Sequence, residues 1–72
     1  SGARGNDDPA KALQEARATQ AESHARAAQS ELKRGALEAA REEALLALRY
    51  WGSAPLTEAP EAVGQVADLA RP

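Results

Sequence analysis

The residues that could do acid–base or metal chemistry are few and scattered. His24 is the only histidine, and the sequence contains no cysteine. A zinc site needs three or four His, Cys or carboxylate ligands that converge on one point, and a single histidine among dispersed carboxylates does not provide them. We therefore expect His24 to be a side chain on the flank of a helix, the alternative being a titrating contact. We expect neither a metal site nor a cofactor.

The carboxylates and hydroxyls form no catalytic pattern either. Glu42 and Glu43 are adjacent, but neighbouring residues on a helix point about 100° apart, so the two carboxylates do not converge on one substrate. The serines and threonines have no histidine or lysine placed to activate them, and no glycine-rich loop follows a strand. A catalytic site needs a preorganised pocket, and the sequence offers little from which to build one. We expect that the chain is not an enzyme.

The composition limits the size of any core. Of the 72 residues, nineteen are alanine, and only twelve apolar side chains are larger than a methyl group. The length allows one small domain. With no disulfide, we expect burial against a partner, a second copy or the rest of a parent chain to contribute to its stability. Because the sequence begins with Ser1 and not with methionine, we interpret it as a piece of a longer protein.

The charges and the apolar runs exclude two classes of partner. Nine Lys and Arg residues against eleven Asp and Glu residues give a net charge of −2, whereas nucleic-acid-binding domains concentrate a basic excess on one face. The longest apolar run, residues 44–48, is far shorter than the roughly 20 residues of a membrane span. We expect a soluble, intracellular chain with no nucleic acid partner and no membrane insertion. Its partner would be another protein or its own copy, a homodimer included.

The chain up to Lys33 divides into a lead-in and a long helix. Residues 1–8 are polar and rich in glycine, and we expect them to be disordered. Asp8 can cap a helix that has Pro9 at its first position, and no glycine or proline interrupts residues 10–33. One stripe of this helix, about 9–33, is apolar and holds Ala10, Ala18, Ala21, Ala25, Ala28 and Leu32. Its alanines allow a second helix to approach closely.

Residues 33–35 decide between two architectures. Lys33 and Arg34 suit the negative end of a helix, and Gly35 accepts the left-handed conformation that terminates one. A hairpin with a second helix at about 36–51 follows from this interpretation. The competing interpretation is one unbroken helix from Pro9 to Trp51, because a glycine inside a helix costs only about 1 kcal/mol.

The second helix is apolar on two sides, which is typical of a helix with two packing partners. Its broad arc includes Leu48 and Trp51, and we expect Trp51 to lie in the core. The smaller patch on the far side holds Leu46 and Tyr50, which face either a partner or the third helix. Leu45 stands alone beside Arg41. The candidate partner-binding residues are therefore Leu45, Leu46, Leu48, Tyr50 and Trp51.

A short third helix is predicted at about 58–70. Leu56, Ala59, Val63, Val66 and Ala70 form a narrow apolar seam on it. A helix this short is weak alone, so we expect it to form only when docked, on this chain or on another. The predicted fold is all-α: a helical hairpin plus this third helix in one small domain, residues 9–70, which can also dimerise into a helix bundle.

The stretch from His24 to Gly52 resembles a single tetratricopeptide (TPR) repeat. The resemblance rests on a turn glycine, small residues between two helices and a large residue after the turn: Ala28, Gly35, Leu37, Ala40 and Ala47. The stretch departs from the family where His24 takes the place of an early aromatic residue and Gly52 replaces the helix-ending proline. The resemblance implies a hairpin with a further helix that binds a peptide or helix in a groove.

Two functions follow as hypotheses. The first is a protein–protein interaction module that holds an amphipathic helix or peptide of a partner in an apolar groove. The alternative is a self-associating docking or dimerisation element, a four-helix bundle or a coiled coil, within a larger assembly.

Overall fold

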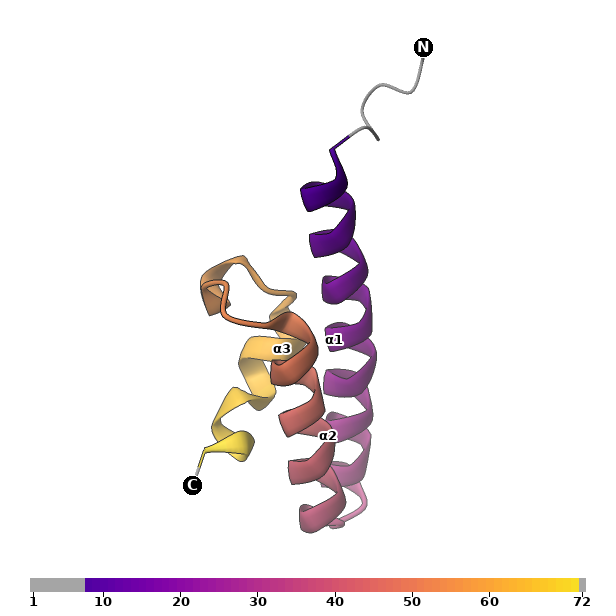
Figure 1. Ribbon diagram of the computed structural model, residues 1–72. Helices are drawn as coiled ribbons and strands as arrows, with labels where there is room; N and C mark the ends of the chain where they lie inside the picture. The colour runs from indigo at the N-terminus through magenta and orange to yellow at the C-terminus, as the bar shows by residue number, and fades with distance from the viewer. Residues whose placement is uncertain (1–7, 72) are drawn as a thin grey trace.

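A computed structural model describes residues 8–71, and its regular structure is entirely helical, with no strand among these residues. The elements are α1 (Pro9–Lys33), α2 (Leu37–Trp51), the 3₁₀ turn η2 (Leu56–Glu58), α3 (Glu61–Val66) and the 3₁₀ turn η3 (Ala67–Ala70). Helices α1 and α2 run antiparallel, and α3 lies beside them (Figure 1). The predicted all-α hairpin with a short third helix is confirmed. The expected disordered lead-in falls on residues 1–7, outside the described residues.

The start of α1 follows from its capping residue. Asp8 has extended backbone angles, and its Oδ1 accepts hydrogen bonds from the backbone N–H groups of Ala10 (3.0 Å) and Lys11 (3.3 Å). Two of the N–H groups that the first helical turn leaves unpaired are thereby satisfied. Pro9 occupies the first helical position, where its missing N–H costs nothing. The predicted start of the helix is confirmed.

The turn between α1 and α2 resolves the choice between a hairpin and one long helix. Gly35 has a φ of 80°, and its N–H donates to the carbonyl of Leu32 at 2.9 Å. The N–H of Ala36 donates to the carbonyl of Glu31, also at 2.9 Å. These two bonds and the left-handed glycine form a Schellman motif, which ends helices. The hairpin is confirmed and the unbroken helix is wrong.

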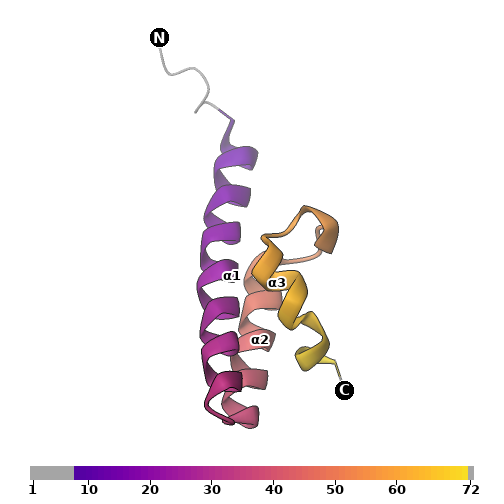
Figure 2. The ribbon, with the colours of Figure 1, turned by 180° about the vertical axis from the view of Figure 1, so that it is seen from behind.

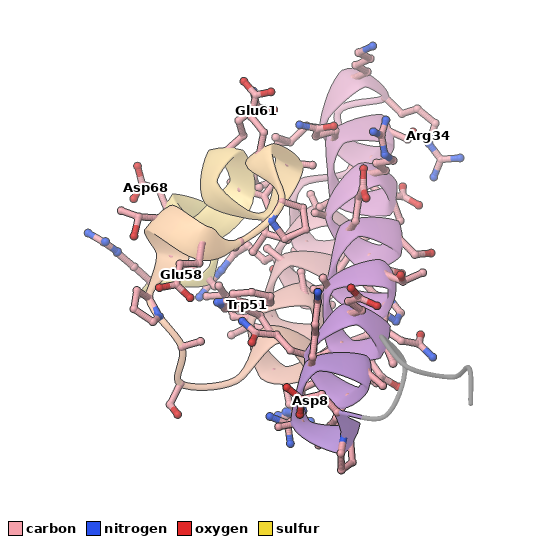
Figure 3. All side chains as sticks on the ribbon, turned by 90° about the horizontal axis from the view of Figure 1, so that it is seen from above. Asp8, Arg34, Trp51, Glu58, Glu61 and Asp68 are labelled. Carbon is pink, nitrogen blue, oxygen red and sulfur yellow. The ribbon has the colours of Figure 1, made fainter. Side chains whose placement is uncertain are left out.

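Alanine forms the contact between the two long helices. Ala21, Ala25 and Ala28 of α1 are fully buried, and so are Ala40, Ala44 and Ala47 of α2. Methyl side chains let two helix backbones approach closely but bury little area each. Trp51 closes this interface at the end of α2: it is 3% exposed, and its Nε1 donates to the carbonyl of Ala54 at 3.0 Å. Figure 3 shows Trp51 between the helices, while Arg34 and Asp68 point outward.

Helix α3 packs on the same chain, across one face of the hairpin. Val63 and Val66 are its fully buried side chains, and they join Trp51 and the alanines in the core. The short third helix predicted at about 58–70 is confirmed, but it begins at Glu61 and its last turn is a 3₁₀ turn. Ala59 precedes a proline and is therefore extended (φ −79°, ψ 160°), so the α-helix begins only at Glu61. From Ala67 the chain tightens into a 3₁₀ turn, as short helices often do at their ends.

The N-terminal part of α1 projects beyond the rest of the molecule (Figures 1 and 2). Helix α2 ends at Trp51, where Gly52 turns the chain with a φ of 90°. Every residue from 9 to 17 is exposed, and Leu13 retains 52% of its accessible surface. This stretch of about three turns therefore has no neighbouring helix from the described part of the chain.

Candidate interaction surface

The five predicted partner-binding residues do not lie together. Trp51 is buried, and Leu48 is half-buried against the core cluster. Leu45 is 44% exposed and Tyr50 is 41% exposed, while Leu46 is half-buried and is not part of the core cluster. Trp51 and Leu48 therefore act in the folded chain as packing residues. Leu46, Tyr50 and Leu45 remain accessible, on two different flanks of α2.

Tyr50 stacks on His24 of the neighbouring helix. The two ring centroids are 5.1 Å apart and the rings are nearly parallel, at 8°. This contact across the hairpin takes the place of the packing on the third helix that was the alternative for Tyr50. Aromatic pairs of this kind contribute about 0.5–1.5 kcal/mol beyond the area they bury. The stack holds the Tyr50 ring in one orientation at the surface.

His24 also pairs with Glu43. Its Nδ1 lies 2.6 Å from Glu43 Oε1, and the two side chains are 26% and 31% exposed. A carboxylate oxygen accepts hydrogen bonds, so His24 Nδ1 is assigned as the donor in this pair. Glu43 thereby orients the imidazole, and Nε2 is the ring nitrogen that it leaves for another group. His24 is therefore more than the helix-flank side chain expected from the sequence, and its partners Glu43 and Tyr50 were not predicted.

A signal for this partnership was present in the position of the turn. In an antiparallel hairpin, residues at similar distances on either side of the turn face each other. Counting back from Gly35 places His24 within about one helical turn of Glu43 and Leu46. The contacts of His24 with Glu43 and Tyr50 therefore depend on the register of the two helices and not on a local sequence motif.

No element within residues 8–71 covers one face of the hairpin, and we call it the open face. Its members lie on the side of α1 and α2 that carries the His24–Tyr50 stack: Leu13, Gln20, His24, Ala27, Ala39, Glu43, Leu46 and Tyr50. Gln29 lies on the other side of α1, because its Nε2 donates a hydrogen bond to Oε1 of Gln65 in α3 at 2.5 Å. Arg41 marks the other side of α2, since its Nε donates to the carbonyl of Leu69 at 3.2 Å. Seen from behind in Figure 2, α3 lies in front of α2, on that covered side.

Leu45 belongs to a separate, shallow hollow on the outer flank of α2. Glu38, Arg41 and Glu42 line it together with Leu45. Arg41 is already engaged with the backbone of η3, so its guanidinium helps to hold the C-terminal turn in place. The hollow is therefore a consequence of the packing of η3 against α2.

Among residues 8–71, no group of three or more His, Cys, Asp and Glu side chains is arranged to hold a metal ion. No helix in this part of the chain has the length and apolarity that crossing a bilayer requires. What the open face offers chemically is apolar area, a fixed tyrosine ring and an oriented imidazole.

Comparison with known proteins identifies no relative. No family model matches the chain, and neither a curated protein nor a solved structure was found to match it.

Proposed function

We propose that this chain is a protein–protein interaction module that holds an amphipathic helix of a partner on its open face. The observation that carries the proposal is the position of Leu46 and Tyr50. They lie four residues apart on α2, and therefore on one side of it, and α3 covers the opposite side of the hairpin. A helix laid along the open face, across α1 and α2, would bury both side chains.

The residue types and the side-chain orientations on the open face favour the binding of a partner. Tyrosine is enriched among the residues that contribute most to protein interfaces. The stack on His24 favours one orientation of the Tyr50 ring, which lowers the side-chain entropy lost when a partner binds. The Nε2 atom of His24 is not used in the bond between Nδ1 and Glu43, so it can form a hydrogen bond with a polar side chain of the partner.

The resemblance to a TPR repeat supports the same class of function. Three of the small residues on which it rests, Ala28, Ala40 and Ala47, are fully buried in the helix contact. Leu37, in the place of the large residue after the turn, is exposed instead. TPR repeats bind peptides or helices in grooves, which is the mode proposed for the open face.

A display library of amphipathic helical peptides tests the proposal. Peptides selected on the native chain are measured against Leu46→Ser and Tyr50→Ala, with Leu45→Ser as a matched control on the outer flank of α2. We expect each open-face substitution to weaken the selected peptides about tenfold or more, the loss typical of a central interface residue. The control should bind as the native chain does. Peptides that bind all three variants and the native chain equally would contradict the proposal.

A second candidate function is a self-associating docking element. The observation in its favour is the projecting part of α1, which is exposed over residues 9–17. The turn at Gly35 excludes its coiled-coil form and leaves the four-helix bundle. Sedimentation equilibrium tests it, since a monomer at high micromolar concentration contradicts it.

A further inference from the structure

An additional helix would stabilise the molecule most if it packed against the projecting part of α1, residues 9–17. A helix of about three turns has little stability of its own in water, and every residue from 9 to 17 is exposed in the described chain. Arg17 lies beside the end of α2, because its Nη1 is 3.7 Å from the position that a Cβ on Gly52 would occupy. Leu13 lies beyond that point and continues the open face.

The area available points to an occupant that spans the whole open face. A stable interface takes about 800 Å² from each partner. The projecting part alone, about 13 Å long and 10 Å wide, is far too small. The complete face is about 37 Å long; it is about 20 Å wide over the roughly 22 Å where α2 lies beside α1 and about 10 Å wide along the rest of α1, which gives about 600 Å², or three quarters of the required area. An occupant must therefore cover Leu13 and the His24–Tyr50 stack together.

The charges on α1 are self-complementary about His24. Arg17 precedes His24 by seven residues, and Glu31 follows it by seven, so two full turns place all three on nearly the same side of the helix. A parallel second copy would bring Arg17 against Arg17 and Glu31 against Glu31. An antiparallel copy brings Arg17 of each chain to Glu31 of the other, where Glu31 also accepts from Arg34 of its own chain.

Resting on the proposed function, we infer that the occupant of the open face is a second copy of this chain. The two copies pack antiparallel about a two-fold axis near His24. In this arrangement His24, Leu46 and Tyr50 of both copies meet at the centre. The two Arg17–Glu31 pairs lie about 10 Å from the axis, toward the rim. The Arg17 and Glu31 charges thus lie toward a polar rim, as is usual in such interfaces, while the His24–Glu43 pair of each copy lies near the centre. A two-fold contact uses the same patch on both partners.

The test is charge reversal, read by sedimentation equilibrium on the full chain. We expect the native chain to be a dimer at high micromolar concentration. Arg17→Glu and Glu31→Arg should each raise the dissociation constant about tenfold, because each removes two ion pairs and creates two like-charge contacts. The matched controls Lys33→Glu and Glu15→Arg make the same charge changes on the far side of α1 and should leave the dissociation constant unchanged.

Mixing the two variants makes the test specific to the register. An Arg17→Glu chain and a Glu31→Arg chain restore both opposite-charge contacts when they pair, so their mixture should form a heterodimer as tight as the native dimer. Circular dichroism checks that each variant is folded, and the mixture remains informative even where one variant is less stable alone.

The outcomes separate this inference from the proposed function. A monomeric native chain, or a dimer that neither charge reversal weakens, overturns the second copy as occupant. If library peptides nevertheless bind through Leu46 and Tyr50, the interaction module stands with another helix as its partner. If the mixture of the two variants fails to associate while the native chain does, the antiparallel register is wrong.

Discussion

Replacing Gly35 with alanine tests the turn that makes the hairpin. Gly35 has a φ of 80°, in the left-handed region, and a Cβ added there would meet no atom within 4 Å. The cost is therefore purely conformational, about 1–2 kcal/mol for a residue with a side chain, reduced by the smaller entropy of the unfolded chain. A net loss of about 1 kcal/mol should lower the Tm by roughly 4–8 °C in a domain of this size.

Thermal unfolding followed by circular dichroism measures this, with two glycine controls in the same chain. Gly64 lies inside α3 without a positive φ and with open space around it, so Gly64→Ala should stabilise by about 0.5–1 kcal/mol. Gly52, at φ 90° and ψ −152°, is in a region almost exclusive to glycine, so Gly52→Ala should cost more than Gly35→Ala. A Gly35→Ala chain that melts at or above the native Tm would refute the reasoning, because one continuous helix prefers alanine there.

Three further substitutions test the cap, the helix contact and the buried indole. Asp8→Ala removes the acceptor for two N–H groups and should cost about 1 kcal/mol, seen as a lower urea midpoint. Ala25→Leu forces three extra carbons between α1 and α2, where Ala25 is fully buried, and should cost about 1–3 kcal/mol in the same urea assay. Trp51→Phe leaves the Ala54 carbonyl without its donor and should cost about 1–3 kcal/mol in a thermal melt, whereas the exposed Leu45→Ser should change the Tm little.

The helices of the hairpin were predictable because their signals are local. Asp8 and Pro9 specify a start, and Gly35 specifies a stop through a backbone conformation that few other residues accept. The third helix was less predictable at its edges. Pro60 imposes an extended conformation on Ala59, so the α-helix starts three residues later than the predicted 58, while the docking of Val63 and Val66 fixes where the element lies.

The surface was harder to predict because it depends on register. The apolar period of α2 placed Leu46 and Tyr50 away from Trp51, but it did not indicate that His24 and Glu43 lie beside them. That information is carried by the distance from the turn to each residue along two helices. Trp51 and Leu48 show the converse: their type suggested an interface, and the folded chain uses them for its own packing.

The alanine contact and the exposed face have one physical origin. Helices that touch through methyl groups leave no room between them for large side chains, so the few that the chain has must sit elsewhere. Six of the twelve are exposed: Leu13, Leu32, Leu37, Leu45, Tyr50 and Leu56. Single exposed leucines are ordinary on protein surfaces, but Leu13 and Tyr50 share a face with the half-buried Leu46. A chain that buries so little between its own helices gains most from a partner that covers that face.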